Sequence, residues 1–539
     1  MKRVPCVLLA SGQAAPFSNG VTAVGGLEVV ASIVELGSGL RLDWSLRNGG
    51  RRAVWARRVG VGVPASPRQV LEHGWQSWSV VRTCDPRDVR PERRHMPGWR
   101  RAMYLLDGHG AGHVVAGDHF LVDDSGVTGF LGARHAFGTV VAQPDGPLVA
   151  WALLDGVAIR PGESRPLDSV WLAAGDPGAL YAEYARHWGE EASARAKTPA
   201  PFAWCSWYRF GSVVTPEDVR RQLRPARAHG LEVIQIDDGW QARVGDWDHC
   251  SSTWSDGVAA LAEEIRATGM RAGIWTAPFL VAETSTVATR HPEWLLRDHR
   301  GRPIRAMDHT TLWGGWAVAL DTTHPGVLDH LRATYARLVE QGFDVHKLDF
   351  LYAGALPGRR HDRSVTRAEA LRRGLDAIRS TVGDRAFLLA CGCPVGPAVG
   401  VVDGMRVSPD TSFCWERPAE VAGLEEAAPS AANALRTSLL RSPLHRRLWI
   451  NDPDCLILRH PLESRTPGQQ RLVVETVART GCYTTLSDDL AEYGPADWQL
   501  VARLRARLPG ADSPVTLVDP FAAEPVAAPA SPPQPRSAA

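Results

Sequence analysis

Eight apolar segments alternate with amphipathic helical patterns between residues 201 and 510, and this alternation constrains the fold most strongly. Five of the helical patterns are followed by a glycine, which favours a helix end: Gly230, Gly269, Gly342, Gly383 and Gly481. Eight strand–helix units are typical of a (β/α)8 TIM barrel. A doubly wound open sheet is the alternative, but no glycine-rich phosphate turn opens the first helix.

The expected strands are Phe202–Arg209, Val233–Trp240, Arg271–Leu280, Val345–Ala353, Ala386–Gly392, Gly404–Thr411, Leu448–Cys455 and Cys482–Asp489. The expected helices are Pro216–His229, Gly257–Thr268, Pro325–Gln341, Arg367–Val382, Ala431–Arg446, Pro467–Arg479 and Ala496–Leu508.

A different pattern precedes the barrel. Residues 40–47 alternate between apolar and polar side chains, and Asn48-Gly49-Gly50 then predicts a hairpin turn. Further short apolar runs separated by Gly, Asp and Pro favour a β-sandwich. We therefore expect a sandwich domain (1–177), a helix and linker (178–200), the catalytic barrel (201–510) and a short C-terminal β remnant (511–539) with a disordered Ala/Pro/Ser-rich tail.

Composition excludes several classes of protein. The net charge of +1, without a basic tract, argues against a nucleic-acid partner. No apolar run is long enough to span a membrane, and the N-terminus is a poor signal peptide. The nine cysteines show no CxxC or metal-type spacing, which favours a reducing, cytoplasmic location. The 20 tryptophans suit a site that stacks against sugar faces.

Candidate functional residues lie at the ends of the expected barrel strands, where barrel enzymes place their chemistry. The carboxylates and cations among them are Asp237, Asp238, Lys347, Asp349, Arg406 and Asp410. Trp240 and Trp275 offer flat faces at two strand ends. Asp488 and Asp489 are interpreted as helix caps. A divalent-metal site is an alternative reading of so many acids, but no histidine accompanies them.

Lys347 and Asp349 lie two residues apart, so on a strand their side chains point to the same face. An ammonium beside a carboxylate favours its ionised form, which a nucleophile on carbon requires. Lys347 is one of three lysines in a chain that otherwise uses arginine. A core strand closed by a salt bridge explains this pair equally well.

Acids, fixed cations and tryptophans around one barrel mouth fit glycoside hydrolysis, which needs two carboxyl groups beside an anomeric carbon. Asp349 would be the nucleophile, and Asp410 would be the general acid and then the general base. The spacing in sequence leaves both the retaining and the inverting mechanism open.

Several motifs resemble the α-galactosidases of glycoside hydrolase family 36, in clan D, across both large domains. They are GWQSWS (74–79), WCSWYRF (204–210), IDDGWQ (236–241) with GDW (245–247), GIW (273–275), KLDFLYAGALPG (347–358), CGCPVGPAVGVVDGMRVSPDT (391–411) and WINDPDC (449–455). The resemblance implies an N-terminal β-supersandwich, a catalytic barrel, a small C-terminal β domain, and retaining chemistry without a metal or other cofactor.

The same resemblance implies a role for each site residue. Asp349 matches the nucleophile and Asp410 the acid/base. Asp237 and Asp238 match the residues that hold the galactose 4- and 6-hydroxyls, and Lys347 and Arg406 match hydroxyl-binding cations. Trp275 matches a stacking wall. Cys391 and Gly392 match the 2-hydroxyl side, and Trp78 lies in the N-terminal motif that adds an aromatic ring to the pocket.

Two departures limit the resemblance. Many bacterial relatives carry KWDMNR around the nucleophile where this chain has KLDFLYAG, so it resembles the compact branch, and its oligomeric state stays open. The C-terminal β domain is also short. The expected function is retaining exo-hydrolysis of α-galactosyl oligosaccharides of the melibiose or raffinose type. Alternatives are an α-N-acetylgalactosaminidase, a raffinose-synthase-like transglycosylase, a non-catalytic sugar-binding protein and a metal-dependent barrel hydrolase.

Overall fold

The computed structural model describes most of the chain. The described residues are 6–9, 14–16, 20–24, 26–106, 114–144, 146–196, 199–420, 422–480, 482–507, 514–522 and 527–529. Gly481, most of the tail after residue 523 and the start of the linker at residues 197–198 lie outside them.

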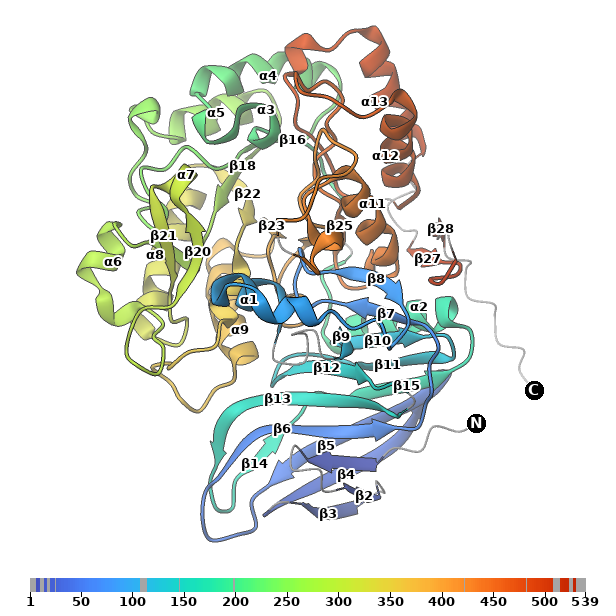
Figure 1. The fold of residues 1–539 in the computed structure, drawn as a ribbon. Helices are drawn as coiled ribbons and strands as arrows, with labels where there is room; N and C mark the ends of the chain where they lie inside the picture. The colour runs from blue at the N-terminus through green and yellow to red at the C-terminus, as the bar shows by residue number, and fades with distance from the viewer. Residues whose placement is uncertain are drawn as a thin grey trace.

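Eight parallel strands form the predicted barrel, in the order β25-β24-β23-β22-β18-β17-β16-β26 (Figure 1). The two end strands meet through the Tyr483 backbone N–H, which donates to the Asn451 carbonyl at 2.7 Å. All eight predicted strands are present, but each ends earlier than predicted. They are β16 (Phe202–Cys205), β17 (Val233–Ile236), β18 (Arg271–Thr276), β22 (Phe343–Leu348), β23 (Phe387–Ala390), β24 (Gly404–Arg406), β25 (Ile450–Asp452) and β26 (Thr484–Leu486).

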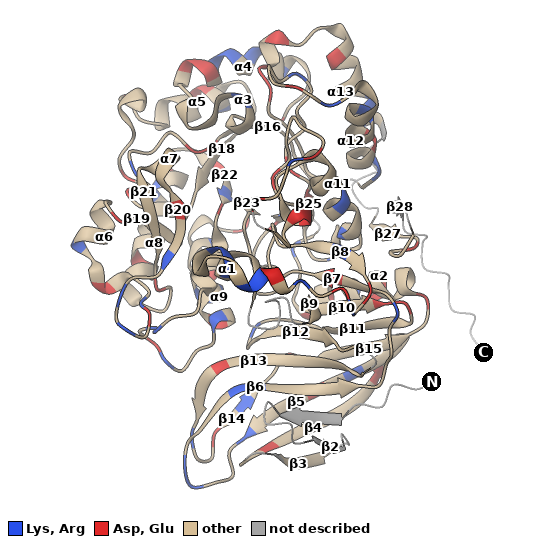
Figure 2. Cartoon of the chain, in the orientation of Figure 1, with Lys and Arg blue, Asp and Glu red and all other residues tan. Residues whose placement is uncertain are grey.

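The predicted helices surround this barrel. They are α4 (Pro216–Ala228), α5 (Ala259–Ala267), α8 (Pro325–Glu340), α9 (Arg367–Val382), α11 (Ala431–Leu440), α12 (Pro467–Thr480) and α13 (Pro495–Arg507). Four of the predicted stop glycines have the positive φ that favours glycine: Gly230, Gly269, Gly342 and Gly383. After β23 the chain forms the four-residue helix α10 (Val395–Ala398). Basic and acidic residues are interspersed on outer helices such as α4 (Figure 2).

An insertion that the sequence patterns did not predict lies between β18 and α8. It contains a three-stranded antiparallel sheet with the order β19-β21-β20, formed by Leu280–Ala282, Gly315–Ala319 and Arg305–His309. The short helices α6 (Thr286–Arg290) and α7 (Thr310–Trp313) belong to the same insertion. Its strands are too short, and too rich in small residues, to show a period-2 pattern. The insertion extends the wall of the barrel mouth.

The N-terminal part is one 15-stranded sheet that turns back on itself (Figure 1). Buried residues of β5, such as Leu42, share a core with residues of β6 and β13, such as Val61 and Ala150. This packing confirms the predicted sandwich. The strands are β1 (Cys6–Leu9), β2 (Ala14–Pro16), β3 (Gly20–Val24), β4 (Leu27–Leu36), β5 (Gly39–Arg47), β6 (Val54–Val63), β7 (Val70–His73), β8 (Val81–Cys84), β9 (Val115–Asp118), β10 (Phe120–Asp123), β11 (Gly126–Phe130), β12 (Phe137–Ala142), β13 (Leu148–Ile159), β14 (Ser164–Pro166) and β15 (Val170–Ala174).

The predicted hairpin at Asn48-Gly49-Gly50 is wrong. β5 pairs with β4, β14 and β15, whereas β6 pairs with β1 and β13. The Asn48 side chain instead donates to the carbonyls of Arg52 and Ile159, both at 2.8 Å. These bonds turn the chain from one layer of the sandwich to the other, and a turn motif alone does not show which strands pair across it.

Two further helices lie next to the N-terminal sheet. α2 (Pro177–Glu191) packs on the N-terminal sheet, and the hairpin of β27 (Val515–Leu517) and β28 (Ala527–Pro529) lies beside α2 (Figure 1). α1 (Gly98–Tyr104) lies between the N-terminal sheet and the barrel (Figure 1). Across the described residues, no helix is both long and apolar enough to cross a membrane.

A buried arginine joins the sandwich to the barrel. The guanidinium of Arg441, after α11, is fully buried and donates to the carbonyls of Ser77 (2.8 Å), Gly74 (3.0 Å) and Gln76 (3.2 Å). It also donates to the carbonyl of Val407, after β24, at 2.8 Å. One side chain therefore satisfies carbonyls of the N-terminal motif and of the barrel mouth together.

His73 completes this arrangement. Burial, with Arg441 nearby, lowers its pKa well below the usual value, so the ring is neutral. Its Nε2 then accepts from Nε of Arg441 at 3.0 Å, and its Nδ1 donates to the Asp118 carbonyl at 3.1 Å.

Replacing Arg441 should destabilise the contact between the two parts. Arg441→Met leaves several buried carbonyls without donors, and each costs about 1–3 kcal/mol. We expect the urea midpoint, followed by tryptophan fluorescence, to fall by an amount equivalent to about 3 kcal/mol or more. Arg503→Met, at an exposed arginine of α13, is the control and should leave the midpoint unchanged. A wild-type midpoint in Arg441→Met would contradict this role.

Candidate active site

A cavity of about 600 Å³ opens at the carboxyl ends of the barrel strands. It brings together most of the residues that the sequence singled out: Trp78, Asp237, Asp238, Trp275, Lys347, Asp349, Cys391, Arg406 and Asp410. Trp240 and Gly392 lie behind this lining. Trp275, Lys347 and Arg406 lie on strands of the barrel, and the carboxylates follow the strand ends in short loops.

Lys347 makes its close ion pair with a residue other than the predicted one. Its Nζ lies 2.9 Å from Oδ2 of Asp237, at the end of β17, and 4.0 Å from Oδ2 of Asp349. Opposite charge on both carboxylates outweighs burial and raises the lysine pKa well above its usual value. Gln235 Nε2 (2.9 Å) and the Cys205 thiol (3.3 Å) also contact Oδ2 of Asp237. Lys347 is thus shared between two acids.

Asp349 follows β22 directly and is held by two N–H donors. The indole Nε1 of Trp275 donates to its Oδ2 at 3.0 Å, and the backbone N–H of Phe350 donates to its Oδ1 at 2.8 Å. N–H donors suit an ionised carboxylate, which only accepts hydrogen bonds. Phe350 has a φ of 53°, an uncommon conformation for a residue with a side chain. The backbone bends sharply where it presents the carboxylate.

Asp410 differs from Asp349 because its carboxyl group contacts an arginine. Arg406 Nη1 lies 3.0 Å from its Oδ1, while the same guanidinium also contacts Asp454 (2.6 Å) and Asp452 (3.4 Å). Burial by the cavity walls raises the pKa of Asp410 to about 6, against the opposing effect of Arg406. The side chain is 45% exposed, and this surface faces the cavity. A carboxyl group with such a pKa can hold a proton near neutrality.

Asp238 is fixed by two side-chain donors. Trp313 Nε1 donates to its Oδ2 at 2.9 Å, and the Gln241 amide donates to its Oδ1. Burial raises the pKa of Asp238 to about 6, although both hydrogen bonds oppose the rise. With its orientation fixed, this carboxyl can accept hydrogen bonds from a polar ligand.

Aromatic rings form one wall of the cavity. Phe350 makes edge contacts with Trp78 and with Trp313, both at 5.2 Å between ring centroids. Trp275 lies 6.3 Å from Trp313. Rings of this kind offer apolar faces to a sugar.

Two predicted binding residues support this wall from behind. A side chain at Gly392 would place its Cβ 2.7 Å from the ring of Trp78, and its φ of 53° suits glycine. Gly392 therefore allows Trp78 to pack closely. Trp240 is 1% exposed and donates through Nε1 to the Trp275 carbonyl at 3.0 Å. The buried ring of Trp240 therefore positions Trp275 and does not offer a ligand the flat face that the sequence predicted.

The sequence patterns missed part of the lining. Trp313 and His309 come from the insertion after β18, and Tyr208 follows β16. Four residues of α1 also face this cavity: Trp99, Arg100, Met103 and Tyr104. The excess of tryptophan was the available signal for Trp313. No local pattern places α1 here, because tertiary contacts bring it to the barrel.

The N-terminal motif 74–79 positions α1. Trp75 Nε1 and Gln76 Nε2 donate to the Met103 carbonyl at 3.0 and 3.2 Å. The Ser79 hydroxyl donates to the Tyr104 carbonyl at 2.8 Å. These bonds satisfy carbonyls at the C-terminal end of a short helix.

Within the part of the chain that the structure describes, no group of three or more His, Cys, Asp or Glu side chains is arranged to hold a metal ion.

Known proteins that are similar to this chain include α-galactosidases. Residues 192–350 match the family model described as Melibiase. The chain is 25% identical over 163 residues to Alpha-galactosidase 2 of Pediococcus pentosaceus. That match covers 29% of this chain and 21% of the relative, so it spans about a fifth of the relative's length.

The similarity to solved structures is more extensive. TtGalA, an α-galactosidase from Thermus thermophilus solved with p-nitrophenyl α-D-galactopyranoside, is 30% identical with a TM-score of 0.74, over 94% of this chain and 97% of that one. AgaA of Geobacillus stearothermophilus, described as a glycoside hydrolase family 36 α-galactosidase, shares the fold at 16% identity. Its TM-score is 0.61, over 96% of this chain and 78% of that one.

The ion pair between Lys347 and Asp237 should be essential for stability. Lys347→Met leaves the carboxylate of Asp237 buried beside an apolar chain, which costs about 3–5 kcal/mol. Adding Asp237→Asn removes the uncompensated charge and should restore most of this loss. Urea unfolding of the single and double variants measures both effects, with Arg224→Met on the exposed face of α4 as the control. Equal destabilisation by the single and double variants would contradict the pairing.

Proposed function

The chain belongs to the α-galactosidases of glycoside hydrolase family 36, and on that premise we propose that it hydrolyses terminal α-galactosyl residues of oligosaccharides by a retaining mechanism. The observation that carries the proposal is that Asp349 and Asp410 line one cavity in different environments. Asp349 accepts from two N–H donors, whereas burial raises the pKa of Asp410 to about 6. Two carboxyl groups whose surroundings differ in this way suit the roles of nucleophile and general acid.

In the first step, a carboxylate oxygen of Asp349 attacks the anomeric carbon of the galactosyl residue. The bond to the leaving oxygen breaks, and Asp410 gives its proton to that oxygen. In the second step, Asp410 takes a proton from water, whose oxygen attacks the anomeric carbon and releases Asp349. Galactose leaves with its original anomeric configuration.

Fixed polar groups around the cavity recognise the sugar. Asp237, Asp238 and Lys347 lie together beside β17 and β22, and we assign them to galactose hydroxyls. Carboxylates accept from vicinal hydroxyls, while the ammonium donates to one. Trp275 supplies an apolar face and orients Asp349 through its indole N–H.

The wall near Cys391 favours a plain galactoside over a 2-acetamido sugar. Trp78 packs directly on Gly392, so a bulky ring closes the side assigned to the 2-hydroxyl, and we infer that an acetamido group does not fit there. An α-N-acetylgalactosaminidase is therefore the less favoured alternative. An N-acetylgalactosaminide tests it, and sugar acceptors test transglycosylation.

A contact over the mouth of the cavity favours action on the end of a sugar chain. Arg100 of α1 forms an ion pair with Glu420 of the loop after β24, at 2.5 Å. This contact joins the sandwich to the barrel above the cavity, which suits removal of a terminal residue. The Thermus thermophilus relative was also solved with stachyose. We infer melibiose, raffinose and stachyose as the substrate class.

The cysteines support a cytoplasmic location. The eight cysteines from Cys84 to Cys482 are free, and five of them are buried. Free thiols of this kind suit a reducing compartment.

Azide should separate the roles of the two carboxyl groups. On p-nitrophenyl α-galactoside, Asp349→Ala should lose at least about 10³-fold in kcat, and azide should restore turnover with β-galactosyl azide as product. Asp410→Ala should form the galactosyl-enzyme from this activated substrate, and azide should then give α-galactosyl azide. NMR of the azide products identifies the anomer.

Matched substrates and variants control this experiment. The α-glucoside and the 2-acetamido α-galactoside should be poor substrates, and Asp376→Asn, at an exposed acid on α9, should behave as wild type. Undiminished activity in Asp349→Ala, or one azide anomer from both variants, would contradict the assigned roles.

The alkaline limb of the pH profile should follow Asp410. Its carboxyl must be protonated to act as acid, so kcat/KM falls as pH rises through its pKa of about 6. The charge of Asp454 raises this pKa and that of Arg406 lowers it. Asp454→Asn therefore lowers the pKa and should shift the alkaline limb to lower pH, by up to about one unit. A limb that stays in place or moves to higher pH would contradict this account.

A further inference from the structure

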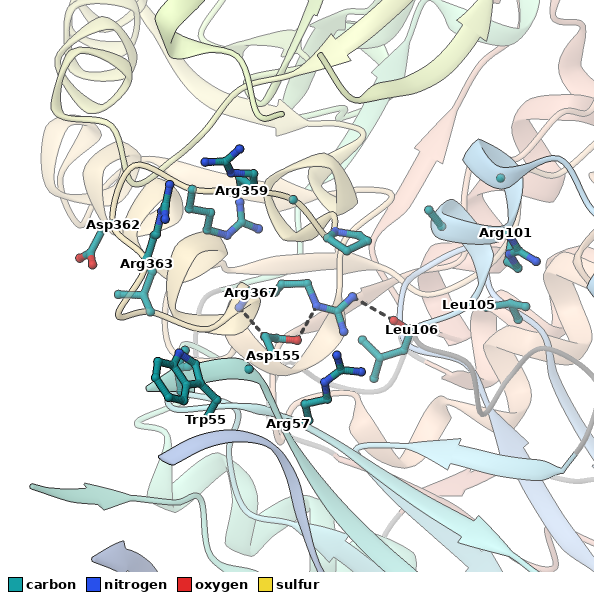
Figure 3. Close-up of a pocket in the computed structure, with 18 residues that line it drawn as sticks. Trp55, Arg57, Arg101, Leu105, Leu106, Asp155, Arg359, Asp362, Arg363 and Arg367 are labelled. Carbon is teal, nitrogen blue, oxygen red and sulfur yellow. Dashed lines mark hydrogen bonds and ion pairs between the residues drawn. The ribbon is translucent and has the colours of Figure 1, made fainter. Parts of the chain in front are cut away.

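A second, larger cavity of about 1000 Å³ lies between the N-terminal sheet and the barrel. We propose that it binds a phosphorylated sugar, with arginine side chains on the phosphate and Trp55 against the sugar ring. Figure 3 shows Trp55 and Arg57 on the sheet side, with Arg359 and Arg363 on the facing loop before α9. This site is separate from the catalytic cavity, and only the use of galactose to fill that cavity rests on the proposed function.

Charge is the first argument. Six arginines and two aspartates line this cavity, in a chain whose net charge is +1. Both aspartates already have partners: Asp155 binds Arg367 at 2.9 Å, and Asp362 binds Arg373 outside the cavity at 2.9 Å. A concave surface with such an excess of positive charge concentrates anions.

The exposed arginines have unused donors. Among the described residues, the guanidiniums of Arg57, Arg359 and Arg363 have no hydrogen-bond or ion-pair partner, and all three residues are exposed. They come from β6 and from the loop before α9, so they face the cavity from two sides. Guanidinium forks match phosphate oxygens in pairs, which makes phosphate the favoured anion.

Hydrogen bonds connect the segments that form the walls between these arginines. A register shift in β13 after Leu153 accompanies a φ of 56° at Asp155. Asp155 then accepts from both the backbone N–H (2.8 Å) and Nε (2.9 Å) of Arg367, which begins α9. Arg367 Nη1 also donates to the Leu106 carbonyl at 3.0 Å. The sheet, α9 and the end of the α1 segment are thus tied together at the base of the cavity (Figure 3).

Trp55 supplies the second argument. Trp55 is 70% exposed, on the face of β6 opposite to Ala56, which is buried in the sandwich core. An exposed indole at the edge of an arginine-lined cavity suits stacking on a sugar ring. The volume exceeds what inorganic phosphate alone would fill, so a sugar has room beside the phosphate.

Calorimetric titration with glucose 6-phosphate tests the site. The full-length enzyme is first saturated with galactose, so that the catalytic cavity is occupied, and ionic strength is held constant. We expect one saturable site per chain for glucose 6-phosphate, weaker binding of inorganic phosphate, and none of glucose. Arg57→Ala/Arg363→Ala should weaken glucose 6-phosphate binding at least about tenfold.

Two further variants make the result decisive. Trp55→Ala should weaken binding of glucose 6-phosphate and leave that of inorganic phosphate unchanged. Arg224→Ala/Arg300→Ala removes two exposed arginines elsewhere and should leave binding as in wild type. No saturable binding, equal loss in both double variants, or equal affinity for glucose 6-phosphate and inorganic phosphate would overturn the proposal. The activity of each variant is measured separately and is expected to remain.

Discussion

The buried guanidinium of Arg441 is the interaction on which the assembled catalytic cavity depends. It binds the carbonyls of Gly74, Gln76 and Ser77, and these residues continue into Trp78, which lines the cavity. The same motif holds α1 through the carbonyl of Met103. A guanidinium has five donors in a fixed plane, which is why it can satisfy several carbonyls from two parts of the chain where an ammonium could not.

Each buried cation of the catalytic cavity contacts more than one carboxylate. Lys347 forms an ion pair with Asp237 at 2.9 Å and lies 4.0 Å from Asp349. Arg406 forms ion pairs with Asp410, Asp452 and Asp454. Because each buried cation contacts several carboxylates, its positive charge offsets only part of the negative charge of each of them. Burial raises the pKa of Asp410 against the opposing charge of Arg406, and the nearby charges of Asp454 and Asp349 add to the rise. Asp410 can therefore hold a proton in the same cavity in which Asp349 accepts hydrogen bonds from two N–H donors.

The sequence predicted the barrel well because its signals are local and repeated. Strand hydrophobicity and glycine stops gave all eight strands and seven surrounding helices, and the strand-end rule gathered Asp237, Asp349 and Asp410 into one cavity. The spacing of Lys347 and Asp349 suggested a direct pair, but the neighbouring strand β17 brings Asp237 closer. Pairing across strands depends on register, which spacing within one strand does not contain.

Tertiary contacts account for what the sequence did not show. Helix α1 has seven residues and no side-chain cap at its N-terminus, so its sequence gives little sign of a helix. Its place is set by the motif at 74–79, and it then separates two cavities. Trp99, Arg100, Met103 and Tyr104 face the catalytic cavity, whereas Gly98, Arg101, Ala102 and Leu105 face the arginine-lined one. The two cavities therefore share one short helix as a wall, and the motif at 74–79 that fixes this helix contributes to both.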